Sequence, residues 1–184
     1  GGTIHTEYEL SSLILPTLHL RVPGDHLLHD AHLAYTVGRL LQMEQEVLTE
    51  GLQRYQGSWR RSEIIGTTKH GNILMSDYGH HPSEILPTIQ AIRAKYSDKK
   101  LFVVFQPHQY SRTKELLDQF AGCFGDLDSL VIPDIYFSRD SHEDVEWMTL
   151  SRLIETIRPH QPAVMDGGGL EHTADIIRAY DHDH

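Results

Sequence analysis

Beyond residue 60, short apolar runs alternate with longer segments of helical periodicity. The run 101–105, Leu-Phe-Val-Val-Phe, is entirely apolar and ends at Gln106-Pro107, which is typical of a buried strand. Similar runs occupy 63–68, 72–76, 130–132 and 163–165. Helical patterns lie between these runs: one ends at about Tyr96, one begins at Ser111, one covers 142–157 and the last ends at Tyr180. This alternation predicts an α/β fold with a Rossmann-like, mostly parallel sheet and helices on both faces.

Residues 1–60 follow a different pattern. Thr3–Leu10 alternates in polarity, and Leu18–Val22 is a second strand candidate that Pro23-Gly24 would end. Two helices are expected next, from Asp25 to about Met43 and from Glu44 to Tyr55. A polar, basic junction at 58–62 separates these elements from the regular alternation, so we predict one part over residues 1–60 and another over 61–184.

Composition excludes several classes of partner. The 184 residues carry a formal net charge of -10, which disfavours nonspecific binding to nucleic acid or to anionic membranes. No apolar run reaches the roughly 18 residues of a membrane span. Cys123 is the single cysteine, so no internal disulfide can form, and we interpret it as part of the core. A reducing, cytoplasmic location is expected.

The stretch from Asp77 to Glu84 joins a strand candidate to a predicted helix. Pro82 suits the first helical position, because its missing N–H would be unpaired there anyway. Free backbone N–H groups at such a helix start attract carboxylates or phosphates, so the stretch predicts a ligand-binding turn. The alternative is that Asp77 and His81 only cap a turn. Pro87, further along, predicts a kink or a restart of the helix.

Three loops would follow successive strands, at 77–81, 106–113 and 134–140, and a doubly wound sheet would bring them to one edge. Arg112 is the strongest candidate among them, because a guanidinium can hold a carboxylate or phosphate through two hydrogen bonds. The alternative for Arg112 is a surface ion pair. The loops also contain Tyr78, His80, His81, His108, Tyr110, Tyr136, Arg139, Asp77, Asp134 and Asp140.

Three motifs resemble the Mur ligases, and most closely the C-terminal domain of their UDP-N-acetylmuramate:L-alanine ligases. They are Ser76–Ile85, Val104–Thr113 and Asp134–Tyr136, and weaker similarity extends to Val22–His26, Gly57–Arg61 and Gly167–Gly169. The resemblance implies that residues 1–60 are a partial α/β segment from the end of the central, ATP-binding domain. Residues 61–184 would then be the C-terminal domain.

The UDP-N-acetylmuramate:L-alanine ligases join L-alanine to the lactyl carboxylate of UDP-N-acetylmuramate, using ATP and Mg²⁺, through an acyl phosphate. The reaction belongs to cytoplasmic peptidoglycan synthesis, and so to the cell wall, cell shape and cell division. The resemblance implies catalytic roles for His80 and Arg112. It implies nucleotide contacts for His26, Asp30, Arg60, Arg61, Asp77, Tyr78 and His80, and substrate contacts for His108, Gln109, Tyr110 and Arg112.

The chain departs from the family pattern in places that bear on function. Leu27 and Asp30 stand where the family often has asparagines, and Gln109 replaces an arginine. No Gly-Lys-Ser or Gly-Lys-Thr loop is present to cradle phosphates, and the UDP-binding domain is absent. We therefore expect a fragment of a longer ligase that lacks its N-terminal part, has its Mg²⁺ ligands mostly elsewhere and is inactive alone. We assign no metal ligand to it.

Other interpretations stay open. His26, His29 and His32, with Asp25 or Asp30, are spaced to share a helix face and could bind a divalent ion, as could His80, His81 and His108. The chain could also be a noncatalytic nucleotide- or peptide-binding remnant. Within the family, the related ligase that recycles murein tripeptide is the nearest rival.

Overall fold

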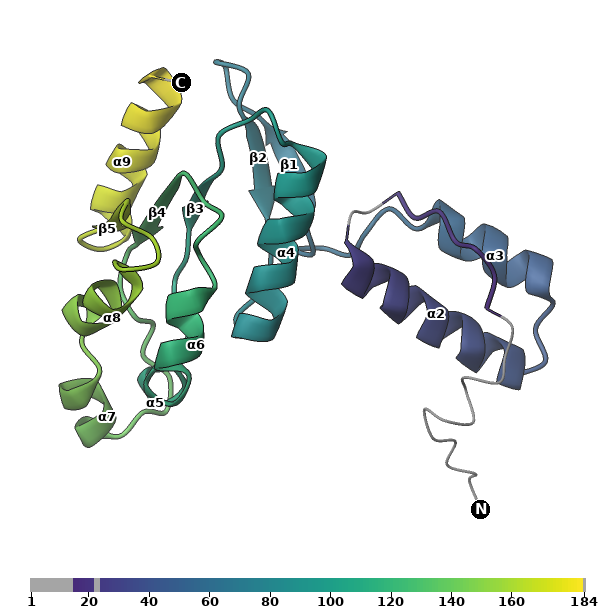
Figure 1. Cartoon of the computed structure of the whole chain (residues 1–184), viewed down its shortest axis with the longest axis horizontal. Coiled ribbons are helices and arrows are strands. Elements are labelled where there is room, and N and C mark those ends of the chain that lie inside the picture. The colour runs from purple at the N-terminus through teal and green to yellow at the C-terminus, as the bar shows by residue number, and fades with distance from the viewer. Residues whose placement is uncertain (1–14, 22–23, 184) are drawn as a thin grey trace.

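The computed structural model describes residues 15–21 and 24–183, and the side chains of Asp25 and His26 are not described (Figure 1). Helices α2 (Asp25–Leu40) and α3 (Gln45–Arg54) agree with the two helices expected from the sequence. They pack closely at Gly38, where an added Cβ would overlap the Leu48 side chain. The alternating segment Thr3–Leu10 lies outside the described residues.

The expected strand at Leu18–Val22 is wrong for residues 18–21, which form no strand. Leu18 is nevertheless buried, and the Pro16 carbonyl accepts a hydrogen bond from His32 Nε2 at 3.1 Å. The segment therefore lies extended against α2. A strand needs a neighbouring strand to pair with, and the described residues provide none at this position.

In the part of the chain that the structure describes, five strands form two separate sheets. Strands β1 (Glu63–Thr67) and β2 (Ile73–Ser76) form at the expected runs 63–68 and 72–76, and they pair antiparallel as a hairpin. Strands β3 (Phe102–Val104), β4 (Ser129–Ile132) and β5 (Val164–Asp166) pair in parallel, in the order β3-β4-β5. The α/β class with a parallel sheet is confirmed. One continuous sheet is not formed, because β2 does not pair with β3.

Helices cover both faces of the parallel sheet. On one face, α4 (Pro82–Lys95), α6 (Leu117–Gly122) and α8 (Leu150–Ile157) share the main core with Leu130 and Ile132 of β4. On the other face lies α9 (Leu170–Asp183), whose Tyr180 ring is 4.2 Å from the Phe102 ring. Since alternate residues of a strand point to opposite faces, the buried Leu130, Val131 and Ile132 let β4 serve both layers.

Two of the expected helices are each divided in two. Between 110 and 122, α5 (Tyr110–Glu115) ends at Leu116 before α6 begins, and Gln109 rather than Ser111 is the N-cap. Between 142 and 157, α7 (His142–Trp147) ends at the extended Met148. The Thr149 side chain then accepts a hydrogen bond from the Arg152 N–H and starts α8. Phe120 of α6 and Phe124, just after its end, are both buried.

Of three expectations about single residues, two are confirmed and one is wrong. Pro82 begins α4 as expected, but α4 continues through Pro87 without a restart. Pro87 lies in the second turn of the helix, so the cost is confined to the Ser83 carbonyl, which loses its helical donor. Cys123 is buried in the core as expected, and burial raises the pKa of its thiol to about 11.

We predict that Gly167→Ala destabilises the fold, because an added Cβ would overlap Thr173 Oγ1 and lie 2.8 Å from Pro133 Cα. The loss in unfolding free energy should be about 2 kcal/mol, as for an overpacked core. Gly122→Ala is the control: nothing lies within 4 Å of its Cβ, so stability should stay equal or rise slightly. Urea denaturation of both variants gives the comparison. Equal stabilities would contradict the packing described for Gly167.

Candidate functional site

Loops 77–81, 106–109 and 133–141 follow β2, β3 and β4 and lie at one edge of the domain, from which α4 and α5 begin (Figure 1). The first loop is held by Asp77. Its Oδ1 accepts a hydrogen bond from the Gly79 N–H at 2.6 Å, and its Oδ2 accepts one from the Ser62 N–H at 2.7 Å. Asp77 thereby ties the loop to the segment that enters the hairpin.

The start of α4 is capped by the chain itself. The Ser83 N–H donates to His81 Nδ1 at 3.2 Å, and Glu84 Oε2 accepts from the N–H groups of His80 and His81 at 3.1 and 3.4 Å. The expectation of free N–H groups here is therefore wrong for these three residues. A capping box satisfies them, with histidine in the position usually taken by serine or threonine.

Glu84 also links two candidate side chains. Its carboxylate lies 3.8 Å from Arg61 Nη1 and 3.4 Å from His80 Nδ1. Burial acts to raise the pKa of Glu84, but the hydrogen bonds from His80 and His81 and the charges of His80 and Arg61 outweigh it. The pKa of Glu84 is therefore lowered below its ordinary value. Glu84 stays ionised and holds this loop through its contacts with His80, His81 and Arg61.

An arginine–aromatic cluster, formed by Trp59, Arg60, Arg61, Tyr78 and His80, surrounds this anchor. The Arg60 guanidinium lies 5.6 Å from the centre of the Trp59 ring and 5.0 Å from that of Tyr78, and Arg61 lies 5.7 Å from Tyr78. The His80 ring meets Tyr78 edge-on at 5.5 Å. Trp59 is 81% exposed and Tyr78 is 51% exposed, so the cluster presents open aromatic faces beside two cations.

The loops after β3 and β4 are joined along their length. The Gln109 N–H donates to the Tyr136 carbonyl at 2.9 Å, and the Tyr136 N–H donates to the Pro107 carbonyl at 2.8 Å. The His108 and Tyr136 rings stack at 5.0 Å, and Gln106 Nε2 donates to Asp134 Oδ1. The structure thus brings together two of the three predicted loops, as expected for the ends of adjacent parallel strands.

Asp140 fixes the start of α5 to the loop after β4. Its Oδ1 accepts from the N–H and hydroxyl of Ser111 at 2.9 and 2.8 Å, and its Oδ2 accepts from the Ser138 N–H at 3.0 Å. Burial acts to raise the pKa of Asp140, but these hydrogen bonds outweigh it and lower the pKa from 3.8 to about 2. Gln109, at a φ of 77°, donates from Nε2 to the Ser138 carbonyl at 2.9 Å.

Arg112 lies in α5, directly behind these joined loops. Its side chain is half-buried, and within the described residues its guanidinium has no hydrogen bond or ion pair. Two carboxylates in the loop after β4 are already engaged, Asp140 with Ser111 and Ser138, and Asp134 with Gln106. An uncommitted, partly desolvated guanidinium is suited to bind an anion through two hydrogen bonds.

The structure places the remaining predicted residues in different surroundings. Asp30 is exposed on α2, Tyr110 packs against the core, and the side chain of His26 lies outside the described residues. No hydrogen bond, ion pair or ring contact in the described chain joins Tyr78 or His80 to the loops after β3 and β4. Within the described ranges, no three His, Cys, Asp or Glu side chains are grouped to hold a metal ion.

Sequence reasoning missed Glu84 and Trp59 as parts of the site. Glu84 had a signal, because a glutamate three residues after a helix N-cap is half of a capping box. Trp59 had a weaker one, as a large aromatic residue in a polar junction. The contacts of Asp77 and Asp140 could not be deduced, because each joins segments that are separated in the sequence by 15 and 29 residues.

Residues 60–181 match the family described as Mur ligase, glutamate ligase domain. The UDP-N-acetylmuramate–L-alanine ligase of Hydrogenobaculum sp. is 42% identical over 122 residues, which cover 66% of this chain and 27% of that protein. The ligase of the same name from Desulfosudis oleivorans is 40% identical over 146 residues, 79% of this chain and 31% of that protein. The chain thus spans less than a third of these two relatives.

Solved structures show the same fold. The UDP-N-acetylmuramate–alanine ligase of Thermotoga maritima superposes with a TM-score of 0.63 at 22% identity, over 81% of this chain and 30% of that one. The murein peptide ligase of Psychrobacter arcticus gives a TM-score of 0.59 at 19% identity, over 88% and 32%. None of the described helices is long and apolar enough to cross a membrane.

We predict that Asp140→Asn lowers the unfolding free energy at neutral pH by about 1 kcal/mol, since water screens part of this charge. The folded-state pKa is depressed, so the stabilisation is present above pH 3.8 and is lost as the pH falls towards about 2. The difference between wild type and variant should therefore shrink over that interval. Urea titrations at several pH values measure it, with the exposed Asp126→Asn as control. A pH-independent difference would contradict the role of the Asp140 charge.

Proposed function

The chain belongs to the Mur ligase family, and we propose that it is the C-terminal part of an ATP-dependent ligase that joins L-alanine to UDP-N-acetylmuramate. The relatives that carry this name support the proposal, with 42% and 40% identity. The reaction would take place in the cytoplasm, as a step of peptidoglycan synthesis. The missing N-terminal part would supply the phosphate-binding loop and the UDP site. The division at residue 60 into the end of a central domain and a C-terminal domain belongs to the same proposal.

The observation that carries the proposal is the uncommitted guanidinium of Arg112. It is half-buried and has no partner among the described residues, whereas neighbouring acids are bound to backbone and side-chain donors. The planar fork of an arginine matches a carboxylate through two hydrogen bonds. We assign Arg112 to the carboxylate of the incoming amino acid. His108, Gln109 and Tyr110 would form the surrounding wall of that subsite.

The arginine–aromatic cluster fits a nucleotide. Arg60 and Arg61 can face phosphate oxygens, and the exposed rings of Trp59 and Tyr78 can pack against a base or sugar. His26 and Asp30 of α2 would approach the adenosine. Asp77 would act by position, since both of its oxygens already hold the loop that carries Tyr78 and His80. The ligands of Mg²⁺ would lie outside the described residues, which present no suitable group.

The mechanism then divides between the missing part and this chain. Bound ATP would supply the phosphoryl group that turns the lactyl carboxylate into an acyl phosphate, open to attack by the amine. Arg112 would hold alanine by its carboxylate and leave its amine pointing at the acyl carbon, which removes the entropic cost of orientation. His80, anchored by Glu84 at 3.4 Å, would place a partly exposed imidazole beside the reacting groups.

Two alternatives stay within reach of the same test. Gln109 donates to Ser138 instead of offering a cation, which favours a noncatalytic nucleotide- or peptide-binding remnant. A ligase that recycles murein tripeptide would share the fold, as the structure from Psychrobacter arcticus does. The first predicts no ligation by any complete polypeptide, and the second predicts tripeptide as the preferred amine.

We predict that Arg112→Ala, placed in the polypeptide of the complete reading frame, raises the KM for L-alanine at least about tenfold. The KM for ATP should change less, because Arg112 is assigned to the amino acid. Arg112→Lys should recover only part of the loss, since a point charge replaces a planar fork. Initial-rate kinetics give both constants, with Arg158→Ala as the control. An unchanged KM for L-alanine would overturn the assignment.

A further inference from the structure

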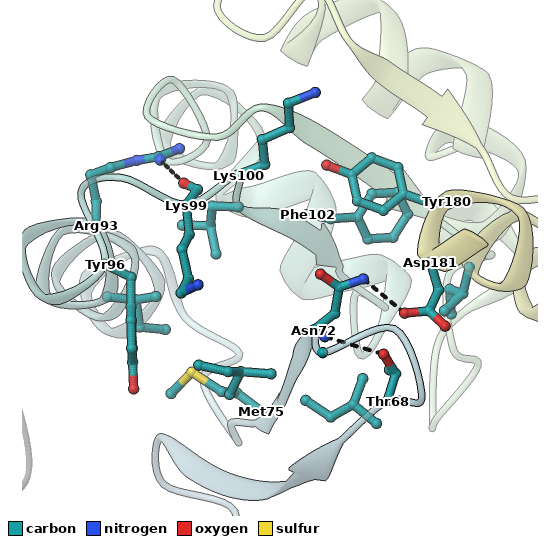
Figure 2. A pocket seen from close by; sticks show the side chains of 16 residues that line it. Thr68, Asn72, Met75, Arg93, Tyr96, Lys99, Lys100, Phe102, Tyr180 and Asp181 are labelled. Atoms are coloured by element: carbon teal, nitrogen blue, oxygen red, sulfur yellow. Dashed lines mark hydrogen bonds between the residues drawn. The ribbon is translucent and has the colours of Figure 1, made fainter. Parts of the chain in front are cut away.

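A cavity of about 300 Å³ lies on the side of the domain away from the candidate site. It is bounded by the hairpin, the C-terminal end of α4, the beginning of β3 and the last turns of α9 (Figure 2). The cavity exists because β2 and β3 do not pair, so that the two sheets leave a space between their neighbouring edges. Its volume is at the lower end of the range for small-molecule sites, roughly 300–1,000 Å³.

The walls of this cavity are mostly apolar. The centres of the Phe102 and Tyr180 rings are 4.2 Å apart, and the two rings together form part of one wall. Apolar side chains of β2, the C-terminal end of α4 and α9 also line the cavity, among them Leu74, Met75, Ile92, Tyr96 and Ile177. Covering such a surface with an apolar molecule removes apolar area from water, which is favourable. The two aromatic rings favour a flat molecule that can stack on them.

Two of the charged groups that line the cavity, Arg93 and Asp181, are already bound. Arg93 donates to the carbonyls of Asp126 and Lys99 and to Asp128 Oδ2 at 2.6 Å. The Asp181 carboxylate accepts from Asn72 Nδ2 at 2.8 Å. Hydrogen bonds from Thr68 and Asn72, with the nearby His70 and Lys69 charges, lower the pKa of Asp181, so its carboxylate stays ionised. Neither group is open to a ligand.

Two adjacent lysines differ in direction. Figure 2 shows the Lys99 ammonium on the cavity side, turned towards Tyr96 and Met75, and the Lys100 ammonium turned away. The Lys100 charge acts on Asp128, where it helps to lower the pKa of that carboxyl. Lys99 has no acidic partner among the described residues. The cavity therefore combines apolar walls with one uncommitted positive charge at its mouth.

We propose that this cavity binds a small, flat apolar molecule that carries one carboxylate. Its body would lie against Phe102 and Met75, and its carboxylate would meet Lys99. A cation would be repelled by Lys99, and a strongly polar molecule would gain nothing from the apolar walls. Since the cavity lies away from the arginine–aromatic cluster and Arg112, an occupant would not compete with nucleotide or amino acid. The proposal does not depend on the ligase function.

The direct test uses 2-naphthoate, an aromatic monocarboxylate, with the 184-residue chain in a calorimetric titration. One molecule should bind per chain, and the neutral analogue 2-naphthalenemethanol should bind about three- to fivefold more weakly, as expected for an exposed ion pair. Lys99→Ala should lower the affinity for 2-naphthoate by the same factor and leave the affinity for the neutral analogue unchanged. The matched control Lys100→Ala should leave both affinities within twofold.

A second variant fills the space. Met75→Trp should abolish binding of both compounds, and Ile177→Trp, from the opposite wall, serves if the first variant unfolds. Circular dichroism with thermal unfolding confirms that a variant is folded. The proposal is overturned if 2-naphthoate shows no saturable binding, or if a folded variant with a filled cavity binds as wild type does. It is also overturned if Lys99→Ala and Lys100→Ala have equal effects.

Discussion

Burial of β4 is the constraint on which the rest of this structure depends. Leu130, Val131 and Ile132 are each 0% exposed, and the strand pairs in parallel with β3 and with β5. Removing each such side chain from water contributes about 1.5–3 kcal/mol. A one-residue slip of β4 would exchange the side chains that face its two layers, so the observed register of β4 also places its two neighbours. The loops after β3 and β4 then meet at one edge.

The loops are held at that edge by the acids of the chain. Asp77 and Asp140 each accept hydrogen bonds from two separate segments, and Glu84 caps α4 while it anchors His80. These carboxylates are therefore committed to structure. Arg112 has no hydrogen bond or ion pair among the described residues, so a chain with a net charge of -10 still presents an uncommitted cation beside these loops. Net charge alone would not have suggested such a cation.

The sequence was sufficient for features that depend on local pattern. Apolar runs located the strands at 101–105 and 130–132, and Pro82 located the start of α4, because burial and backbone geometry leave local signatures. It was insufficient wherever a distant partner decides the outcome. The segment with Leu18 is apolar enough for a strand but has no strand beside it, and the α7–α8 break depends on how Met148 packs.

The candidate site divides along the same line. Arg112, Tyr78 and His80 were predicted from residue type and position after strands, their proposed roles come from the resemblance of the surrounding motifs, and those roles stay predictions. What could not be predicted is which groups are already engaged. In the sequence, Asp77 and Asp140 cannot be told from carboxylates that are free to bind a ligand. Only the fold shows that they accept hydrogen bonds from backbone N–H groups. The gap between β2 and β3, which creates the cavity, is likewise a property of strand pairing.

The most direct measurement of the central claim is product identification by mass spectrometry. The polypeptide of the complete reading frame would be incubated with ATP, Mg²⁺, UDP-N-acetylmuramate and an equimolar mixture of L-alanine and murein tripeptide. The account predicts one dominant product, UDP-N-acetylmuramate extended by a single alanine, formed only with ATP. A dominant tripeptide product, or no ligation by a folded polypeptide, would contradict it.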